Sequence, residues 1–173
     1  MLCGRVFVLI FTYAIVQIEC NITDWSKDYP LPYQFNFTDS RRFEIGCMVI
    51  IYVQLQEHAV IGLHDQNDNI NLNITVRTWA VVLSSRFYDD VGENVYICER
   101  DSYIECTNDN GISEVIIARV EGGFNVFMNG KRRNTNVYPG KLRTEAVSLL
   151  VQSEEVGKNF EVTGITALLP DLI

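Results

Sequence analysis

The chain has 173 residues, of which 47% are hydrophobic and 11% aromatic, and this is enough apolar mass for one packed domain. Its 14 Lys and Arg residues against 22 Asp and Glu residues give a formal charge of -8, which argues against a protein that binds nucleic acid through the phosphates. The hydrophobic fraction is too high for an intrinsically disordered chain.

The first 20 residues differ in character from the rest of the chain. One base, Arg5, precedes an uncharged apolar run from Val6 to Val16. A run of this length after an N-terminal base is typical of a secretory signal peptide, and it is short for a membrane span. We therefore expect residues 1–20 to be removed, leaving a secreted, extracellular protein with no stable membrane insertion. An N-terminal membrane anchor is the alternative.

Beyond this segment, residues 21–39 predict an extended N-terminal arm and residues 40–173 predict one β-sandwich domain. Apolar and polar residues alternate with a period of two, which is typical of strands. Such runs cover residues 43–55, 58–65, 69–77, 80–88, 94–100, 113–121, 123–130, 145–153 and 160–169. Turn-forming residues separate them, and Asn129-Gly130 is a strong hairpin signal. About ten short strands with such turns predict an all-β, antiparallel sandwich.

Secretion gives the sequons and the cysteines a specific meaning. N-glycosylation sequons begin at Asn21, Asn36 and Asn73. In an oxidising compartment, Cys98 and Cys106 are the natural disulfide pair. Cys47 lies in an apolar run and is expected to be a buried thiol, with an intermolecular bond as the alternative.

The motifs of common enzymes and metal sites are missing. There is no G-x-S-x-G elbow, and His58 and His64 have no cysteines at zinc-binding spacing. Residues 65–69 begin like a calcium-binding loop, but Ile70 and Val76 stand where that loop needs Gly and Glu. We therefore expect a solvated turn there, no metal and no cofactor.

Some enzymes with a sandwich fold hydrolyse glycosides with a pair of carboxylates, and the sequence contains a candidate pair. Glu99 and Asp101 are two positions apart and would share one face of a strand. The next residue in phase is Tyr103 rather than a third carboxylate, and the expected Cys98–Cys106 bond closes the segment tightly. We therefore expect a protein that is not an enzyme.

A binding face is the remaining interpretation. The alternate positions of residues 70–101 carry Asn, Thr, Arg, Ser, Tyr and Glu side chains. Such mixtures bind sugars, because planar polar groups bond to hydroxyls and aromatic rings stack on the apolar face of a pyranose. Ordinary solvated strand surface is the alternative. Trp79, in a connection between strands, either packs under the turn or contacts a ligand.

Several segments resemble the galectin family of galactoside-binding lectins. These are FNVFMNGK at 124–131 (family F-x-V-x-V-N-G), LNITVR at 72–77 (L-H-F-N-P-R), VVLSSR at 81–86 (I-V-x-N-S-x), YICERD at 96–101 (W-G-x-E-x-R), and Tyr138 with AVSLLVQS at 146–153 (the closing strand). The resemblance spans residues 40 to 169. It implies a galectin-type jelly roll whose sugar site lies on a concave sheet face.

The resemblance also implies a set of carbohydrate-binding residues. Carried over position by position, they are Asn73, Thr75, Arg77, Ser84, Tyr96 and Glu99. The family's His and first Asn fall on Asn73 and Thr75, and its second Arg falls on Asp101. We therefore expect glycans or glycoproteins as partners, with altered or weakened galactoside specificity. The alternative is a degenerate lectin fold that acts as an extracellular protein-interaction module; the sequence leaves the oligomeric state open.

Overall fold

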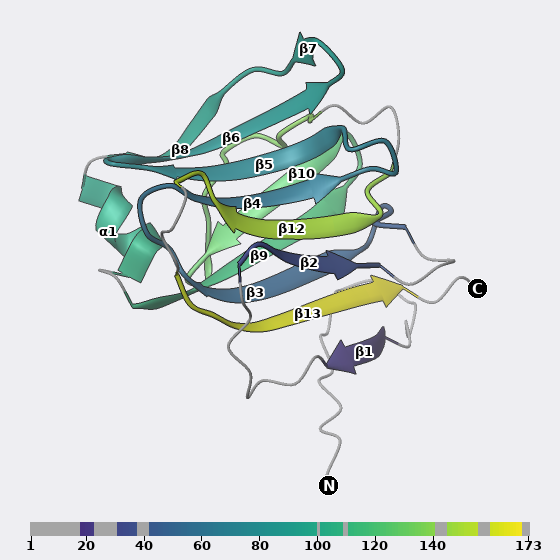
Figure 1. Ribbon diagram of the computed structural model, residues 1–173, viewed down its shortest axis with the longest axis horizontal. Helices are drawn as coiled ribbons and strands as arrows, with labels where there is room; N and C mark the ends of the chain where they lie inside the picture. The colour runs from purple at the N-terminus through teal and green to yellow at the C-terminus, as the bar shows by residue number, and fades with distance from the viewer. Residues whose placement is uncertain are drawn as a thin grey trace, which may run out of the picture.

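The described residues form two antiparallel sheets that pack face to face (Figure 1). The computed structural model describes residues 18–22, 31–37, 42–99, 101–108, 111–140, 145–155 and 160–170. The first sheet contains, in spatial order, β1 (Ile18–Ile22), β13 (Val162–Pro170), β3 (Met48–Gln54), β9 (Ile112–Val120), β10 (Gly123–Met128) and β11 (Lys131–Arg132). The second contains β2 (Tyr33–Asn36), β12 (Ser148–Ser153), β4 (Ala59–His64), β5 (Ile70–Arg77), β6 (Ala80–Phe87) and β7 (Asp90–Val91), and β8 (Val95–Glu99) also pairs with β6. The predicted all-β sandwich with a single domain is confirmed.

Strand β4 shows how the alternation builds the core. Ala59, Ile61 and Leu63 are at most 1% exposed and belong to the cluster between the sheets. Burying a side chain of the size of Ile61 stabilises the fold by about 1.5–3 kcal/mol. Gly62 and His64 lie at the alternate positions and therefore belong to the outward face. The same alternation in β5 and β6 keeps one face of the second sheet free of core residues.

The described residues of the predicted arm are part of this sandwich. Within residues 21–39, Tyr33–Asn36 form the edge strand β2, paired with β12. Phe37 follows and is only 5% exposed, and its ring stacks on that of Phe43 with centroids 5.2 Å apart. This contact attaches the edge strand to the core.

The N-terminal segment is described only from residue 18 onward. Residues 1–17 of the predicted signal peptide lie outside the described residues. Strand β1 pairs Ile18–Ile22 with Thr166–Pro170 of β13 and so lies across the expected cleavage point. Among the described residues, no helix is long and apolar enough to cross a membrane. Cleavage after residue 20 therefore stays a prediction.

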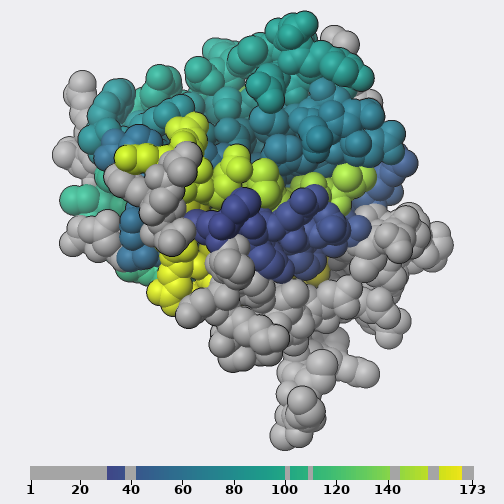
Figure 2. Space-filling view, in the orientation of Figure 1, coloured from purple at the N-terminus to yellow at the C-terminus, as the bar shows by residue number. Residues whose placement is uncertain are grey.

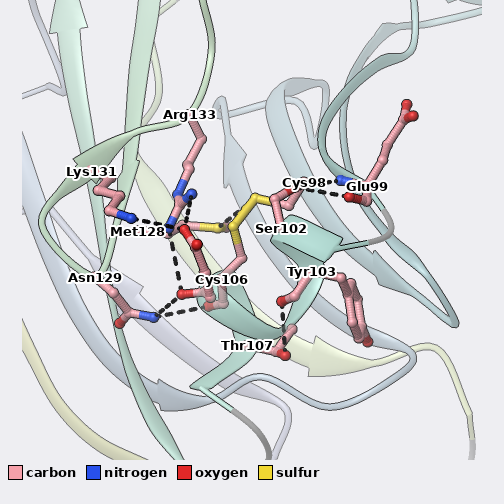
Figure 3. The surroundings of a disulfide bond; sticks show 11 residues. Cys98, Glu99, Ser102, Tyr103, Cys106, Thr107, Met128, Asn129, Lys131 and Arg133 are labelled. Atoms are coloured by element: carbon pink, nitrogen blue, oxygen red, sulfur yellow. Dashed lines mark hydrogen bonds and ion pairs between the residues drawn. A yellow bond between two sulfur atoms is a disulfide. The ribbon is translucent and has the colours of Figure 1, made fainter.

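A short helix, α1 (Asp101–Thr107), lies where the sequence predicts only a turn (Figures 1 and 3). The expected disulfide between Cys98 and Cys106 is present and joins the end of β8 to this helix. The Ser102 hydroxyl donates to the Glu99 carbonyl at 2.9 Å and accepts from the Glu99 N–H at 3.1 Å. These local bonds satisfy backbone groups where the strand stops, so the helix can begin at once.

The predicted hairpin at Asn129-Gly130 joins β10 to β11. Both residues have positive φ, 52° and 74°, which is the backbone conformation that the Asn-Gly pair tolerates in a tight hairpin. The Asn129 side chain also donates to the carbonyls of Glu105 and Cys106 at 2.7 and 3.2 Å. One turn residue therefore fixes both the hairpin and helix α1 (Figure 3).

Candidate functional site

The register of β5 and β6 gathers four of the predicted site residues on the outward face of the second sheet. Asn73 lies directly opposite Ser84, and Thr75 and Arg77 follow along β5 at intervals of two. The residues between them belong to the core. Figure 2 shows β4, β5 and β6 (blue to teal) beside β12 (yellow-green) on the visible side of the molecule.

Strand β8 extends this face by Tyr96 and Glu99. Tyr96 lies opposite Val82 of β6, and Glu99 lies opposite Ala80. Residues three apart on a regular strand point to opposite faces, but the register of β8 shifts at this point, as at a bulge. The extra residue lets Tyr96 and Glu99 share the outward face with the four residues of β5 and β6.

The side chains of Asn73 and Thr75 are bonded to each other. The Asn73 amide donates to the Thr75 hydroxyl over 3.1 Å, and Thr75 is only 4% exposed. The Thr75 hydroxyl keeps its own O–H to donate, but its burial leaves little of it accessible to a ligand. Of this pair, the Asn73 carbonyl oxygen is the group left to accept from outside.

Arg77 has a partner that the sequence did not indicate. Its Nη1 lies 2.7 Å from Oε2 of Glu154, and its Nη2 lies 3.5 Å from Oε1, so the contact is nearly bidentate. Glu154 follows β12, and its N–H bonds to the carbonyl of His58 at the start of β4. The ion pair therefore reaches across β4. Arg77 and Glu99, both expected to bind carbohydrate, share a face, but the acid paired with Arg77 is Glu154.

Two aromatic rings lie together on the surface at the same end of this face. Trp79, in the turn between β5 and β6, is 55% exposed, and Tyr96 is 50% exposed. Their rings are nearly parallel, at 6°, with centroids 6.1 Å apart. Trp79 therefore does not pack under its turn, and the two rings form a half-exposed stack that starts two residues after Arg77 in the chain.

The carboxylate pair considered for hydrolysis is not arranged on one strand. Glu99 is the last residue of β8, and Asp101 is the first residue of α1. The alternation that would give the two residues a common face therefore ends at Glu99. Arg100, between them, lies outside the described residues.

His64 and Gly62 belong to this face, although the expected site residues do not include them. A β-carbon on Gly62 would lie 2.7 Å from Nε2 of His64 and 3.3 Å from Oδ1 of Asn73. The imidazole therefore lies over Gly62, beside Asn73, in space that any other residue would fill. Burial lowers the pKa of His64 below its ordinary value of 6.5. The alternation in residues 58–65 already puts Gly62 and His64 on the face away from the core, so the sequence could have identified both residues.

Helix α1 is anchored beside this face by charge as well as by the disulfide. Glu105 accepts from Lys131 at 2.9 Å and lies 3.4 Å from the guanidinium of Arg133 (Figure 3). The hydrogen bond from Lys131, and then that from Arg133, lowers the pKa of Glu105. These contacts join α1 to β11 and to the residues after it.

Cys47 is a buried free thiol, as the sequence predicts. It is 3% exposed, and its sulfur accepts from the Glu44 N–H over 3.2 Å. Burial is the main cause that raises its pKa. An intermolecular disulfide through this residue would require the sandwich to open.

The three sequons differ in their surroundings. Asn36 is exposed at the end of β2, whereas Asn73 is half-buried in β5 between two neighbouring strands. The backbone of Asn21 lies in β1. Glycosylation at these positions stays a prediction, and a glycan on Asn73 would cover the outward face, so a binding role for Asn73 requires this sequon to be unoccupied.

Titratable side chains in the described part of the chain form no group of three or more that could hold a metal ion. Residues 65–69 form the expected turn with residues 66–68 exposed, and the turn is built around a buried carboxylate. Asp65 is 2% exposed, and its Oδ1 accepts from the N–H groups of Asn67 and Asn69 at 2.8 and 2.9 Å. The Asn69 side-chain amide donates to Oδ2 of the same carboxylate at 2.9 Å. The acid thus shapes the β4–β5 turn.

Comparison with solved structures identifies the fold. The chain is similar to sheep galectin-11 in complex with glycerol (16% identity, TM-score 0.61, 81% of this chain and 99% of that one). It is similar to galectin LEC-6 of Caenorhabditis elegans (16%, 0.58, 82% and 92%) and to a doubly substituted human galectin-16 (14%, 0.59, 81% and 96%). No protein-family model matches the sequence, and neither does any curated protein. The chain has the galectin fold, and the resemblance seen in the sequence is confirmed at that level.

Proposed function

We propose that this chain is a secreted, non-catalytic carbohydrate-binding protein whose specificity for galactosides is altered. The proposal rests on the galectin fold together with one local observation. A half-exposed stack of Trp79 and Tyr96 and an Arg77–Glu154 ion pair lie on the sheet face that the resemblance assigns to sugar, and Trp79 follows Arg77 by two residues. Sugar sites combine these two kinds of group, an aromatic surface and a fixed set of hydrogen-bonding groups.

The aromatic stack supplies the apolar part of such a site. The C–H groups on one side of a pyranose form an apolar surface that packs on an aromatic ring. Tyr96 stands where the galectin pattern has Trp, and Trp79 extends the aromatic surface from the neighbouring turn. Because the two rings stack on each other, neither has to be ordered when the ligand arrives.

The polar part of the site is held in place by contacts within the protein. Glu154 fixes the guanidinium of Arg77, whose remaining N–H groups can donate to hydroxyls. Ser84 of β6 lies opposite Asn73 of β5, and the two side chains add two further polar groups to the face. Together they form a row of groups next to the stack.

Altered specificity follows from which polar groups are missing. Asn73 and Thr75 occupy the positions of the family's His and Asn, and the Asn73 amide donates to the Thr75 hydroxyl over 3.1 Å instead of to a ligand. A site built to hydrogen-bond one hydroxyl strongly rejects ligands when its groups are lost or otherwise engaged. The galectin mode of holding galactose is therefore not available to this pair.

A glycan array probed with the secreted protein tests the proposal. Arg77→Ala and Trp79→Ala are expected to remove most of the signal. The first substitution removes the ordered donor, and the second removes one of the two stacked rings. Arg132→Ala and Tyr88→Ala are matched controls, since they remove an exposed Arg of β11 and an exposed aromatic residue of the β6–β7 turn. Both controls are expected to bind like the wild type.

Three outcomes contradict parts of the proposal. A blank array with correctly folded wild-type protein favours the protein-interaction module instead. Binding that survives Arg77→Ala and Trp79→Ala would mean that glycans bind elsewhere on the molecule. Release of free sugar from the arrayed oligosaccharides would contradict the non-catalytic part of the proposal.

A further inference from the structure

The absence of a side chain at Gly62 creates a place for an imidazole on the outward face. Gly62 lies in the middle of β4, opposite Asn73 of β5 and Leu150 of β12. A β-carbon there would come within 2.7 Å of Nε2 and 3.1 Å of Cδ2 of His64. Real β-carbons essentially never approach another atom that closely, so the ring position of His64 depends on this glycine.

The same glycine brings the imidazole next to Asn73. Oδ1 of Asn73 lies 3.3 Å from the position that the β-carbon of Gly62 would take, and His64 Nε2 lies 2.7 Å from the same position. The Asn73 amide nitrogen donates to Thr75, and Oδ1 is the atom of Asn73 that lies near the position over Gly62. A nitrogen of His64 and an oxygen of Asn73 thus lie around one point on the face.

We propose that His64 and Asn73 together bind one hydroxyl group of the glycan, with His64 entering the site from β4 over Gly62. The proposal rests on the carbohydrate-binding function proposed above and adds a specificity-determining residue to it. By the resemblance, Asn73 of β5 stands where the family has His. The imidazole of His64, from the neighbouring strand β4, then supplies the polar group that β5 lacks.

A neutral imidazole suits this task because it can donate from one nitrogen while Asn73 accepts. A sugar hydroxyl has one proton and two lone pairs, so it can accept from Nε2–H and donate to Oδ1 at once. Burial favours the neutral form of His64, and Arg86 acts in the same direction, whereas Asp65 and Asp68 favour the charged form. Burial is the largest of these effects.

Calorimetry with the glycan that gives the strongest signal on the array tests the assignment. His64→Gln and His64→Ala are expected to weaken binding about three- to tenfold, the effect of losing one hydrogen bond to a neutral group. Gly62→Ala is expected to weaken it to a similar degree, because the added methyl group displaces the ring. His58→Gln, which removes the chain's other imidazole, is the control and is expected to bind like the wild type.

A double variant distinguishes displacement of the ring from general damage to the sheet. If Gly62→Ala acts through His64, the variant that combines it with His64→Ala binds no more weakly than His64→Ala alone. Thermal unfolding of each variant identifies any loss of fold, and the comparison is then made on the folded protein.

The outcomes separate this proposal from the one on which it rests. Wild-type binding that is unchanged in His64→Gln overturns the role of His64 and leaves the lectin proposal standing. Additive losses in the double variant overturn the role of Gly62 in placing the ring. An array on which the wild type binds nothing overturns both proposals together.

Discussion

Arg77 depends on a carboxylate from a distant part of the sequence. The Arg77–Glu154 contact is exposed at both ends, so its direct contribution to stability is small, within about 1 kcal/mol. Its value lies in holding the guanidinium in one orientation. We predict that Glu154→Gln leaves the free energy of unfolding almost unchanged but weakens glycan binding about three- to tenfold. Chemical denaturation and calorimetry check the two halves, and equal binding by the variant would contradict the ordering role of Glu154.

His64 links this face to pH. Its pKa in the folded state is lowered, mainly by burial and also by Arg86, against the opposing effects of Asp65 and Asp68. The unfolded chain therefore binds a proton more readily, and the contribution of His64 to stability is fully present above pH 6.5 and is lost as the pH falls toward the lower folded pKa.

We therefore predict that the wild type loses stability relative to His64→Gln as the pH is lowered from about 7 to about 5. All other titratable groups are common to both proteins, so the difference between the two curves isolates His64. Denaturant unfolding at a series of pH values measures it. A difference that does not change with pH would show that the imidazole is solvated in the folded protein.

At the scale of elements, helix α1 and its disulfide fix the end of β8. Both cysteines are fully buried, and the bridge closes a loop with a sequence separation of 8. Closing such a loop in the unfolded chain is worth about 2–3 kcal/mol. We predict that replacing Cys98 and Cys106 by Ala lowers the free energy of unfolding by at least this amount, since packing is also lost.

Denaturant unfolding measures the loss, and hydrogen exchange locates it. Amide protons of residues 101–107 are expected to lose protection first, because the disulfide, the Asn129 side chain and the Glu105 ion pairs hold this helix. Cys47→Ala is a control that removes a buried sulfur without breaking a bridge. Unchanged protection of the helix in the double variant would show that the other contacts suffice.

The strands could be predicted because the alternation of apolar and polar residues that marks a strand lies within one short segment. The period-two pattern in residues 58–65 and 69–77 places every second side chain in the core, and the structure follows it in β4 and β5. Helix α1 was not predicted because seven residues are too few to show a reliable helical periodicity. The edge strand β2 was not predicted because it pairs with β12, a segment far away in the chain.

The candidate site was predictable in part for the same reason. Asn73, Thr75 and Arg77 alternate along one strand, so their common face could be read from spacing alone. Glu154 could not, because its meeting with Arg77 depends on β12 and β4 lying side by side. The position of the His64 ring depends on an empty volume over Gly62, which no pattern of residue types reveals.

For the molecule as a whole, neighbouring residues of β6 separate the roles of the two faces. Leu83 is fully buried between the sheets, whereas Val82 is 8% exposed and lies on the outward face opposite Thr75. We predict that Leu83→Ala destabilises the fold by about 2–5 kcal/mol but leaves the glycan affinity of folded protein unchanged.

Val82→Ala is expected to cost less stability, because the outward face can relax toward solvent, and to weaken glycan binding because Val82 lies opposite Tyr96. Denaturant unfolding and calorimetry on both variants make the comparison. The reverse order of effects would mean that the two faces of β6 have been assigned wrongly.

The buried thiol of Cys47 can report when the sandwich opens. With the disulfide formed and the predicted signal peptide removed, Cys47 is the only thiol left in the mature chain. Its burial and raised pKa keep it from reacting with alkylating reagents until the sandwich opens. The rate of alkylation therefore counts opening events, and a sugar that binds only the closed form slows it in proportion to occupancy. Ligands could be ranked in this way without labels or immobilisation, wherever on the folded molecule they bind.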